Sequence, residues 1–117
     1  MLQLFHNNRC GKSRDCLAIL EKSGREFQIV FYLTSPPTAD ELKIILQKLN
    51  LQPIDLVRQK EKIWIEKYKA QSLTTEETIT ALITNPILIE RPIIVTHKKA
   101  IIAREESKII AFLRDTD

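Results

Sequence analysis

The sequence is short of several residue types, and each shortage excludes a class of protein. It has 2 cysteines among 117 residues, too few for the disulfide framework of a small secreted domain. No apolar run approaches the about 20 residues of a membrane-spanning helix, and the N-terminus becomes polar too early to hold a signal peptide's apolar segment. The length suits one hydrophobic core. We therefore expect a single cytoplasmic domain over residues 1–117 that binds no membrane.

An excess of charge of one sign is also missing. The 18 Lys and Arg residues exceed the 15 Asp and Glu residues by only 3, and both signs are mixed along the chain, as in Arg58–Lys62 and Arg104–Lys108. A surface that binds nucleic acid would be more densely basic, so we predict no nucleic-acid partner. The small positive surplus favours a small anion as ligand, although a role in solubility explains it equally well.

Hydrophobic residues nevertheless make up 44% of the chain, and their spacing predicts an α/β layer fold. Strand-like runs occur near both ends, at Leu2–Phe5, Phe27–Leu33, Ile93–Thr96 and Ala100–Ala103. A helix from Gly11 to a stop at Gly24 joins the first two runs, which predicts a parallel pair with a helical crossover. The polar turn His97–Lys99 predicts a hairpin, and Glu105–Leu113 predicts a closing helix.

The middle of the chain is predicted to be wholly helical over residues 38–84. Thr38 with Glu41, and Thr74 with Glu77, have the spacing of a capping box, in which each side chain caps the other's backbone N–H. Apolar residues follow each box at helical intervals. A short helix between these two is indicated by Ile63, Trp64 and Tyr68.

Cys10 is the candidate nucleophile because it lies where the first strand gives way to the helix from Gly11. Its sulfur would face the free N–H groups and the positive end of that helix, which favour a thiolate. Arg14 and His6 are close in sequence and could add to this effect. A buried apolar role is the alternative reading of Cys10. Cys16 is predicted to pack inside the helix, with an auxiliary redox role as the alternative.

A second thiol must come from another molecule. Ser13 stands where a Cys-x-x-Cys motif would carry its second cysteine, and two helical cysteines six residues apart would be roughly 9 Å distant, beyond the about 7 Å that a disulfide spans. A phosphatase-type Cys-x5-Arg loop would need arginine where Cys16 stands. The spacing of the cysteines and histidines matches no structural zinc site, so we predict no metal.

Arginine is the side chain best suited to hold a bound oxyanion, because its planar guanidinium donates two parallel hydrogen bonds. Arg91 and Arg104 flank the predicted hairpin and are expected on one rim of the sheet. Arg25 and Arg114, near helix ends, are expected to be solvated. The chain has seven arginines, at positions 9, 14, 25, 58, 91, 104 and 114, and each taken alone is most often a surface residue.

Several ordered segments together resemble a known family. His6–Arg14 resembles the His-Asn-x-x-Cys-x-x-Ser-Arg signature of the glutaredoxin-coupled arsenate reductases. Tyr32–Pro37, Leu56–Arg58 and Asn85–Val95 extend the resemblance over nearly the whole chain. Two parts of the sequence also resemble a paralogous branch of this family whose substrate is uncertain. They are the segment Cys10–Ser13 and the segment around Glu90, within Asn85–Val95. Arg104 is followed by Glu105 where the family usually has proline.

The resemblance implies a thioredoxin-like mixed sheet flanked by helices, with a helical insertion at about 38–84. It also implies a cis peptide before Pro92. By resemblance, Cys10 is the nucleophile and His6 assists the thiolate. Five further residues fall at positions implied to bind the oxyanion, namely Arg58, Arg91, Arg104, Ser13 and Arg14.

The implied reaction reduces arsenate to arsenite, with glutathione as co-substrate, glutaredoxin as partner and no tightly bound cofactor. Reduction of another small oxyanion is an alternative. A second alternative is a thiol-based transcriptional regulator that binds RNA polymerase, because a sister branch of such regulators shares the fold. That branch typically carries Cys-x-x-Cys, and Ser13 argues against it.

Overall fold

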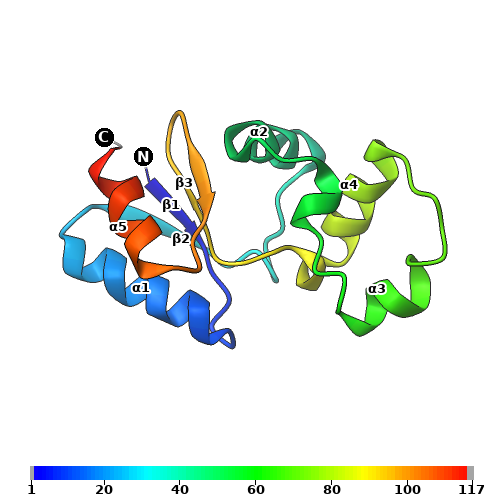
Figure 1. The fold of residues 1–117 in the computed structure, drawn as a ribbon, viewed down its shortest axis with the longest axis horizontal. Helices are drawn as coiled ribbons and strands as arrows, with labels where there is room; N and C mark the ends of the chain where they lie inside the picture. Colours follow the sequence, from blue (N-terminus) through cyan, green and yellow to red (C-terminus); the bar gives the residue numbers. More distant parts are fainter. Residues whose placement is uncertain (1, 116–117) are drawn as a thin grey trace. The chain divides into compact units, whose positions relative to one another are not determined.

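The computed structural model describes residues 2–115, which fall into two compact units (Figure 1). One unit is made of Met1–Ser35 with Arg91–Asp117, and the other of Pro36–Glu90. The first holds the sheet and two α-helices, and the second holds three α-helices, two short 3₁₀ helices and an isolated β-bridge. The prediction of one domain over the whole chain stays a prediction. No helix within residues 2–115 is both long and apolar enough to span a membrane.

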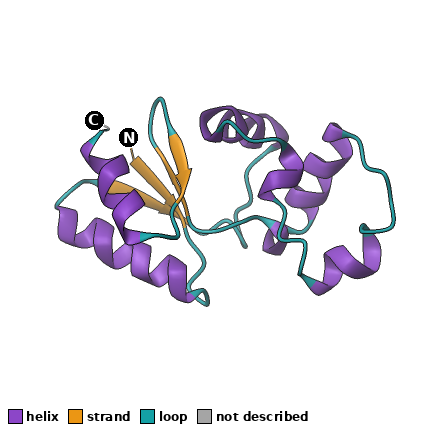
Figure 2. Cartoon of the chain, viewed as in Figure 1, coloured by secondary structure: helices purple, strands orange, loops and turns teal. Residues whose placement is uncertain are grey.

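A four-stranded mixed sheet forms the centre of the first unit (Figure 2). Its strands are β1 (Leu2–Phe5), β2 (Phe27–Val30), β3 (Ile93–Val95) and β4 (Ala100–Ile102), in the order β2-β1-β3-β4. Strands β1 and β2 are parallel, as the crossover predicts, whereas β3 runs antiparallel to both β1 and β4. The register places Leu4 opposite Ile29 on one side and Ile94 on the other.

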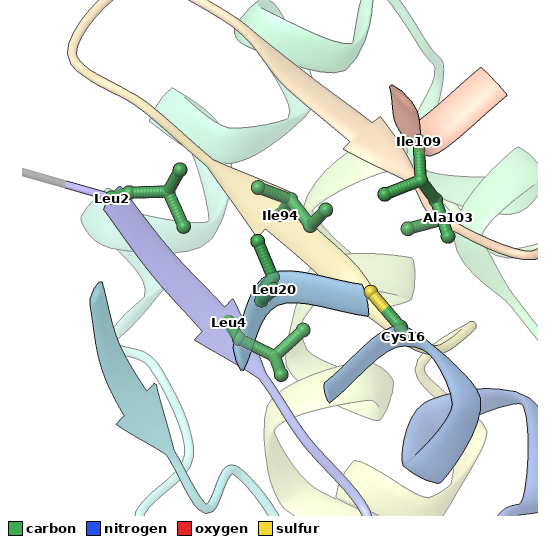
Figure 3. Close-up of a cluster of buried hydrophobic side chains, with 7 residues drawn as sticks. All are labelled: Leu2, Leu4, Cys16, Leu20, Ile94, Ala103 and Ile109. Atoms are coloured by element: carbon green, nitrogen blue, oxygen red, sulfur yellow. The ribbon is translucent and has the colours of Figure 1, made fainter. Parts of the chain in front are cut away.

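Two helices pack on one face of this sheet and close its core. Helix α1 (Gly11–Ser23) ends at Gly24, whose positive φ of 74° suits glycine, and α5 (Glu106–Arg114) follows β4. Figure 3 shows the buried cluster that joins them to the sheet. It comprises Leu2, Leu4, Cys16, Leu20, Ile94, Ala103 and Ile109. The loop that leads into α1 leaves the sheet at the end of β1, which lies beside the start of β3.

The second unit contains the α-helices α2 (Ala39–Leu49), α3 (Lys62–Lys67) and α4 (Thr75–Thr84) and the short 3₁₀ helices η1 (Pro53–Leu56) and η2 (Pro86–Leu88). Both predicted capping boxes are present, at Thr38 before α2 and at Thr74 before α4. Helices α2 and α4 pack against each other.

Two element predictions are wrong in part. The strand expected over Phe27–Leu33 ends at Val30, because the carbonyl of Phe31 accepts the N–H groups of Thr34 and Ser35 and turns the chain. The segment 38–84 is not wholly helical, since Val57 pairs with Ile89 in an isolated β-bridge. The predicted cis peptide between Arg91 and Pro92 is confirmed.

Candidate active site

Cys10 is the N-cap residue of α1, at the end of the loop that follows β1. Its backbone is extended, with φ of −96° and ψ of 122°, and its carbonyl accepts the N–H of Arg14 at 3.0 Å. The first turn of α1 contains no acidic residue. The sulfur therefore lies at the positive end of a helix where no carboxylate of that turn opposes a negative charge. The predicted placement of Cys10 at a helix start is confirmed.

Donors around the sulfur favour the thiolate. Partial burial by itself raises the pKa of Cys10, but the backbone N–H of Ser13 and the guanidinium of Arg91 donate hydrogen bonds to the sulfur. The positive charge of Arg91 and the N–H of Lys12 act in the same direction. The net effect is a pKa of Cys10 below its ordinary value. More of this cysteine is therefore nucleophilic at neutral pH than of a free cysteine.

Cys16 lies in the opposite environment. Its side chain is fully buried in the cluster of Figure 3, next to apolar residues of the sheet. This burial raises the pKa of Cys16 to about 12. Both cysteines are free thiols. The predicted packing role of Cys16 is confirmed.

His6 is buried and linked to the start of α1 through Ser13. Its Nδ1 lies 2.6 Å from Ser13 Oγ, and the same Oγ accepts the backbone N–H of Asn7 at 3.0 Å. Burial lowers the pKa of His6; a hydrogen bond with the Asn8 side chain raises it, and the Arg14 charge lowers it further. The net pKa of His6 is lowered, which favours the neutral ring, and Nδ1 shares one hydrogen bond with the Ser13 hydroxyl. His6 thereby positions Ser13, whose N–H faces the Cys10 sulfur.

The loop between β1 and α1 is held by its own polar groups. Asn7 is buried, its Oδ1 accepts the N–H of Arg9 at 2.9 Å, and its carbonyl accepts the N–H of Cys10 at 3.0 Å. Arg14 Nη1 donates to the carbonyl of Asn8 at 2.8 Å. Asn7 was not among the predicted site residues, although it matches the asparagine of the family signature. A second signal was its place in a polar loop, where an asparagine side chain often bonds the backbone two residues on.

The hairpin brings the two predicted rim arginines together. Arg91 precedes β3 and contacts the Cys10 sulfur, while Arg104 follows β4 and its Nη1 donates to the carbonyl of Arg91 at 2.7 Å. Glu105, the acid beside Arg104, is the N-cap residue of α5 but makes no side-chain capping bond, and it pairs with Lys108 at 3.4 Å. Arg91 and Arg104 thus lie on one rim, as expected. Their role as oxyanion ligands, like that of Ser13 and Arg14, stays a prediction.

Arg58 belongs to the helical unit and is paired there with two carboxylates. It lies 3.4 Å from Glu61 and 3.4 Å from Glu90. Its predicted part in oxyanion binding stays a prediction. Glu61 lies three residues after Arg58, a spacing that could have indicated this ion pair from the sequence. Glu90 is distant from Arg58 in the sequence, so no spacing pattern indicated the second ion pair.

Arg25 and Arg114 were both expected to be solvated, and this prediction is confirmed for Arg114 alone. Arg114 is exposed, but Arg25 is half-buried and donates to the carbonyl of Leu113 at 2.9 Å. The last carbonyls of a helix have no partner within it, and Arg25 supplies one for the end of α5.

This arrangement can hold a negative charge and carry out nucleophilic attack. Two backbone N–H groups at a helix start and one guanidinium converge on a lowered-pKa thiol, and such donors are also the usual ligands of a bound oxyanion. Within residues 2–115, no three His, Cys, Asp or Glu side chains gather as a metal site would require.

Comparisons with known proteins agree on one family. The model of the ArsC family matches residues 5–112. An Escherichia coli protein named uncharacterized protein YfgD is 39% identical over 111 residues, covering 93% of each chain. An arsenate reductase of Neisseria meningitidis is 36% identical over 114 residues, covering 96% of this chain and 97% of the relative. The solved structure of an arsenate reductase from Vibrio cholerae has a TM-score of 0.87 at 34% identity, covering 94% of this chain and 95% of that one.

Proposed function

Because the chain belongs to the ArsC family, and has its thioredoxin-like fold with a helical insertion, we propose that it reduces arsenate to arsenite. Cys10 is the nucleophile, glutathione the co-substrate and glutaredoxin the partner. The observation that carries this proposal is the set of donors on the Cys10 sulfur: the N–H groups of Ser13 and Lys12 and the guanidinium of Arg91. These groups favour the thiolate before reaction and can bind the oxygens of a substrate during it.

The reaction begins with attack of the Cys10 thiolate on arsenic(V). A sulfur–arsenic bond forms and an arsenic–oxygen bond breaks, so that the oxygen leaves as water after protonation. The thiol of glutathione then displaces a second oxygen in the same way. Arg91 and Arg104, and by family resemblance Arg58, neutralise the oxygens that remain on arsenic.

Reduction requires a third thiol. Glutaredoxin attacks the sulfur of the arsenic-bound glutathione, and the electron pair of that arsenic–sulfur bond stays on arsenic, which becomes arsenic(III). The products are a disulfide between glutathione and glutaredoxin and an arsenic(III) adduct on Cys10, which water releases as arsenite. Ser13 in place of a second cysteine is consistent with the need for external thiols. Reduced thiols are kept in the cytoplasm, where we place the protein.

A coupled assay tests this proposal. The purified protein is mixed with arsenate, glutathione, glutaredoxin, glutathione reductase and NADPH, and the consumption of NADPH is followed. The proposal predicts arsenate-dependent consumption that stops when either glutathione or glutaredoxin is left out. Turnover with a different small oxyanion but not with arsenate would reassign the substrate. Co-purification with RNA polymerase and no turnover would favour a regulator instead.

A further inference from the structure

A hollow of about 320 Å³ lies between the stretch of α1 from Lys12 to Ile19 and the beginning of α5, within the sheet-containing unit. These two helices run side by side over the same face of the sheet (Figure 1). The floor of the hollow is apolar and includes Ala103 and Ile109, two members of the core cluster in Figure 3. The rim is charged and consists of Lys12, Asp15, Arg104 and Glu106.

The hollow adjoins the nucleophile at two points. Lys12 lines the hollow, and its backbone N–H donates to the Cys10 sulfur. Arg104 also lines it and donates to the carbonyl of Arg91, whose guanidinium contacts the same sulfur. Cys10 itself does not line the hollow, but two residues that do are linked to its sulfur, Lys12 directly and Arg104 through Arg91.

The charges of the rim do not suit a small oxyanion. Lys12 and Arg104 would attract an anion, but Asp15 and Glu106 would repel it. A small oxyanion also has no apolar surface that could pack against the apolar floor. The complementary ligand is a small molecule that has carboxylates, an ammonium group and apolar surface together. At neutral pH glutathione carries two carboxylates, one ammonium group and a thiol on an uncharged backbone.

We propose that this hollow is the glutathione site. A carboxylate of the tripeptide pairs with Lys12, its ammonium group pairs with Asp15 or Glu106, and its thiol is directed at the arsenic held on Cys10. Holding two reactants side by side in this way turns attack by a dissolved thiol into attack within one complex. The inference rests on the proposed function for the reaction, but binding of the tripeptide can be measured without arsenate.

The test fills the hollow and leaves the reacting groups in place. Ala18 is exposed on α1 and lines both this hollow and a neighbouring one toward the end of the helix, so Ala18→Trp places a large side chain where the two meet. Ala39→Trp, at an exposed position at the start of α2, is the matched control. We expect Ala18→Trp to raise the KM for glutathione about tenfold or more, equivalent to about 1.4 kcal/mol, with the KM for arsenate unchanged.

Charge variants test the rim separately. Lys12→Gln should raise the KM for glutathione about twofold to fivefold, the usual size for an exposed charge pair. Its control is Lys22→Gln at the far end of α1, outside this hollow.

The outcomes separate this inference from the proposed function. If arsenate is turned over and both tryptophan variants have the same KM for glutathione, the hollow is not the glutathione site and the function stands. If no arsenate is turned over, S-methylglutathione, which lacks a free thiol, is titrated into the protein and amide resonances are followed by NMR. Shifts at Asp15, Ala18 and Glu106 support the site, and their absence at millimolar ligand overturns it.

Discussion

Ser13→Ala should destabilise the protein through two buried groups that depend on one hydroxyl. The side chain is fully buried, and its Oγ accepts the Asn7 N–H at 3.0 Å and lies 2.6 Å from His6 Nδ1. A buried polar group that loses its partner costs about 1–3 kcal/mol. Two such losses, less about 0.5 kcal/mol for the better helix propensity of alanine, predict a fall of about 1.5–5.5 kcal/mol in the free energy of unfolding.

Urea denaturation followed by far-UV circular dichroism measures this change, with Ser107→Ala as the control. Ser107 is exposed in the first turn of α5, so its replacement should change the free energy of unfolding by less than about 0.5 kcal/mol. Ser13→Ala should also raise the pH at which Cys10 is half alkylated, because the N–H of Ser13 would be less firmly held against the sulfur. Equal unfolding midpoints in the two variants would refute the role assigned to the His6–Ser13 contact.

Three further predictions concern the charges around the site. Alkylation of Cys10 by iodoacetamide should accelerate as pH rises, because the thiolate reacts, and should reach half its maximum below the pH typical of a free cysteine; a midpoint at or above that value would remove the premise of the mechanism. Arg91→Ala and Arg104→Ala should each weaken arsenate binding, measured by calorimetry, about tenfold to a hundredfold. Lysine should not restore binding, and Arg114→Ala should have no effect. Glu90→Gln removes a carboxylate 3.4 Å from Arg58 and should lower the KM for arsenate, whereas an unchanged KM would show that this pair does not compete with substrate.

Local signals in the sequence predicted most of the fold. The capping boxes at Thr38 and Thr74 and the stop at Gly24 are each formed by residues within one helical turn, so their spacing alone locates a helix end. The end of β2 was placed too late because the turn at Phe31 depends on backbone hydrogen bonds, not on residue type. The apolar character of residues 31–33 continued the strand pattern past its end.

The candidate site was predictable where the chain itself brings residues together. Cys10 and Ser13 share a helix start, and Arg91 and Arg104 flank one hairpin, so position along the chain was enough. The ring nitrogen that Ser13 contacts and the carboxylate of Glu90 beside Arg58 lie in other segments. Contacts of that kind follow from tertiary packing, which residue spacing does not encode.

The central claim is that Cys10 alone is the nucleophile, and one comparison tests it most directly. Cys10→Ser and Cys16→Ser are assayed side by side for arsenate-dependent consumption of NADPH with glutathione, glutaredoxin and glutathione reductase. Because Cys10 has a lowered pKa at the start of α1 and Cys16 is buried with a pKa raised to about 12, Cys10→Ser should abolish turnover and Cys16→Ser should retain most of it. Equal loss in both variants, or turnover by Cys10→Ser, would contradict the account.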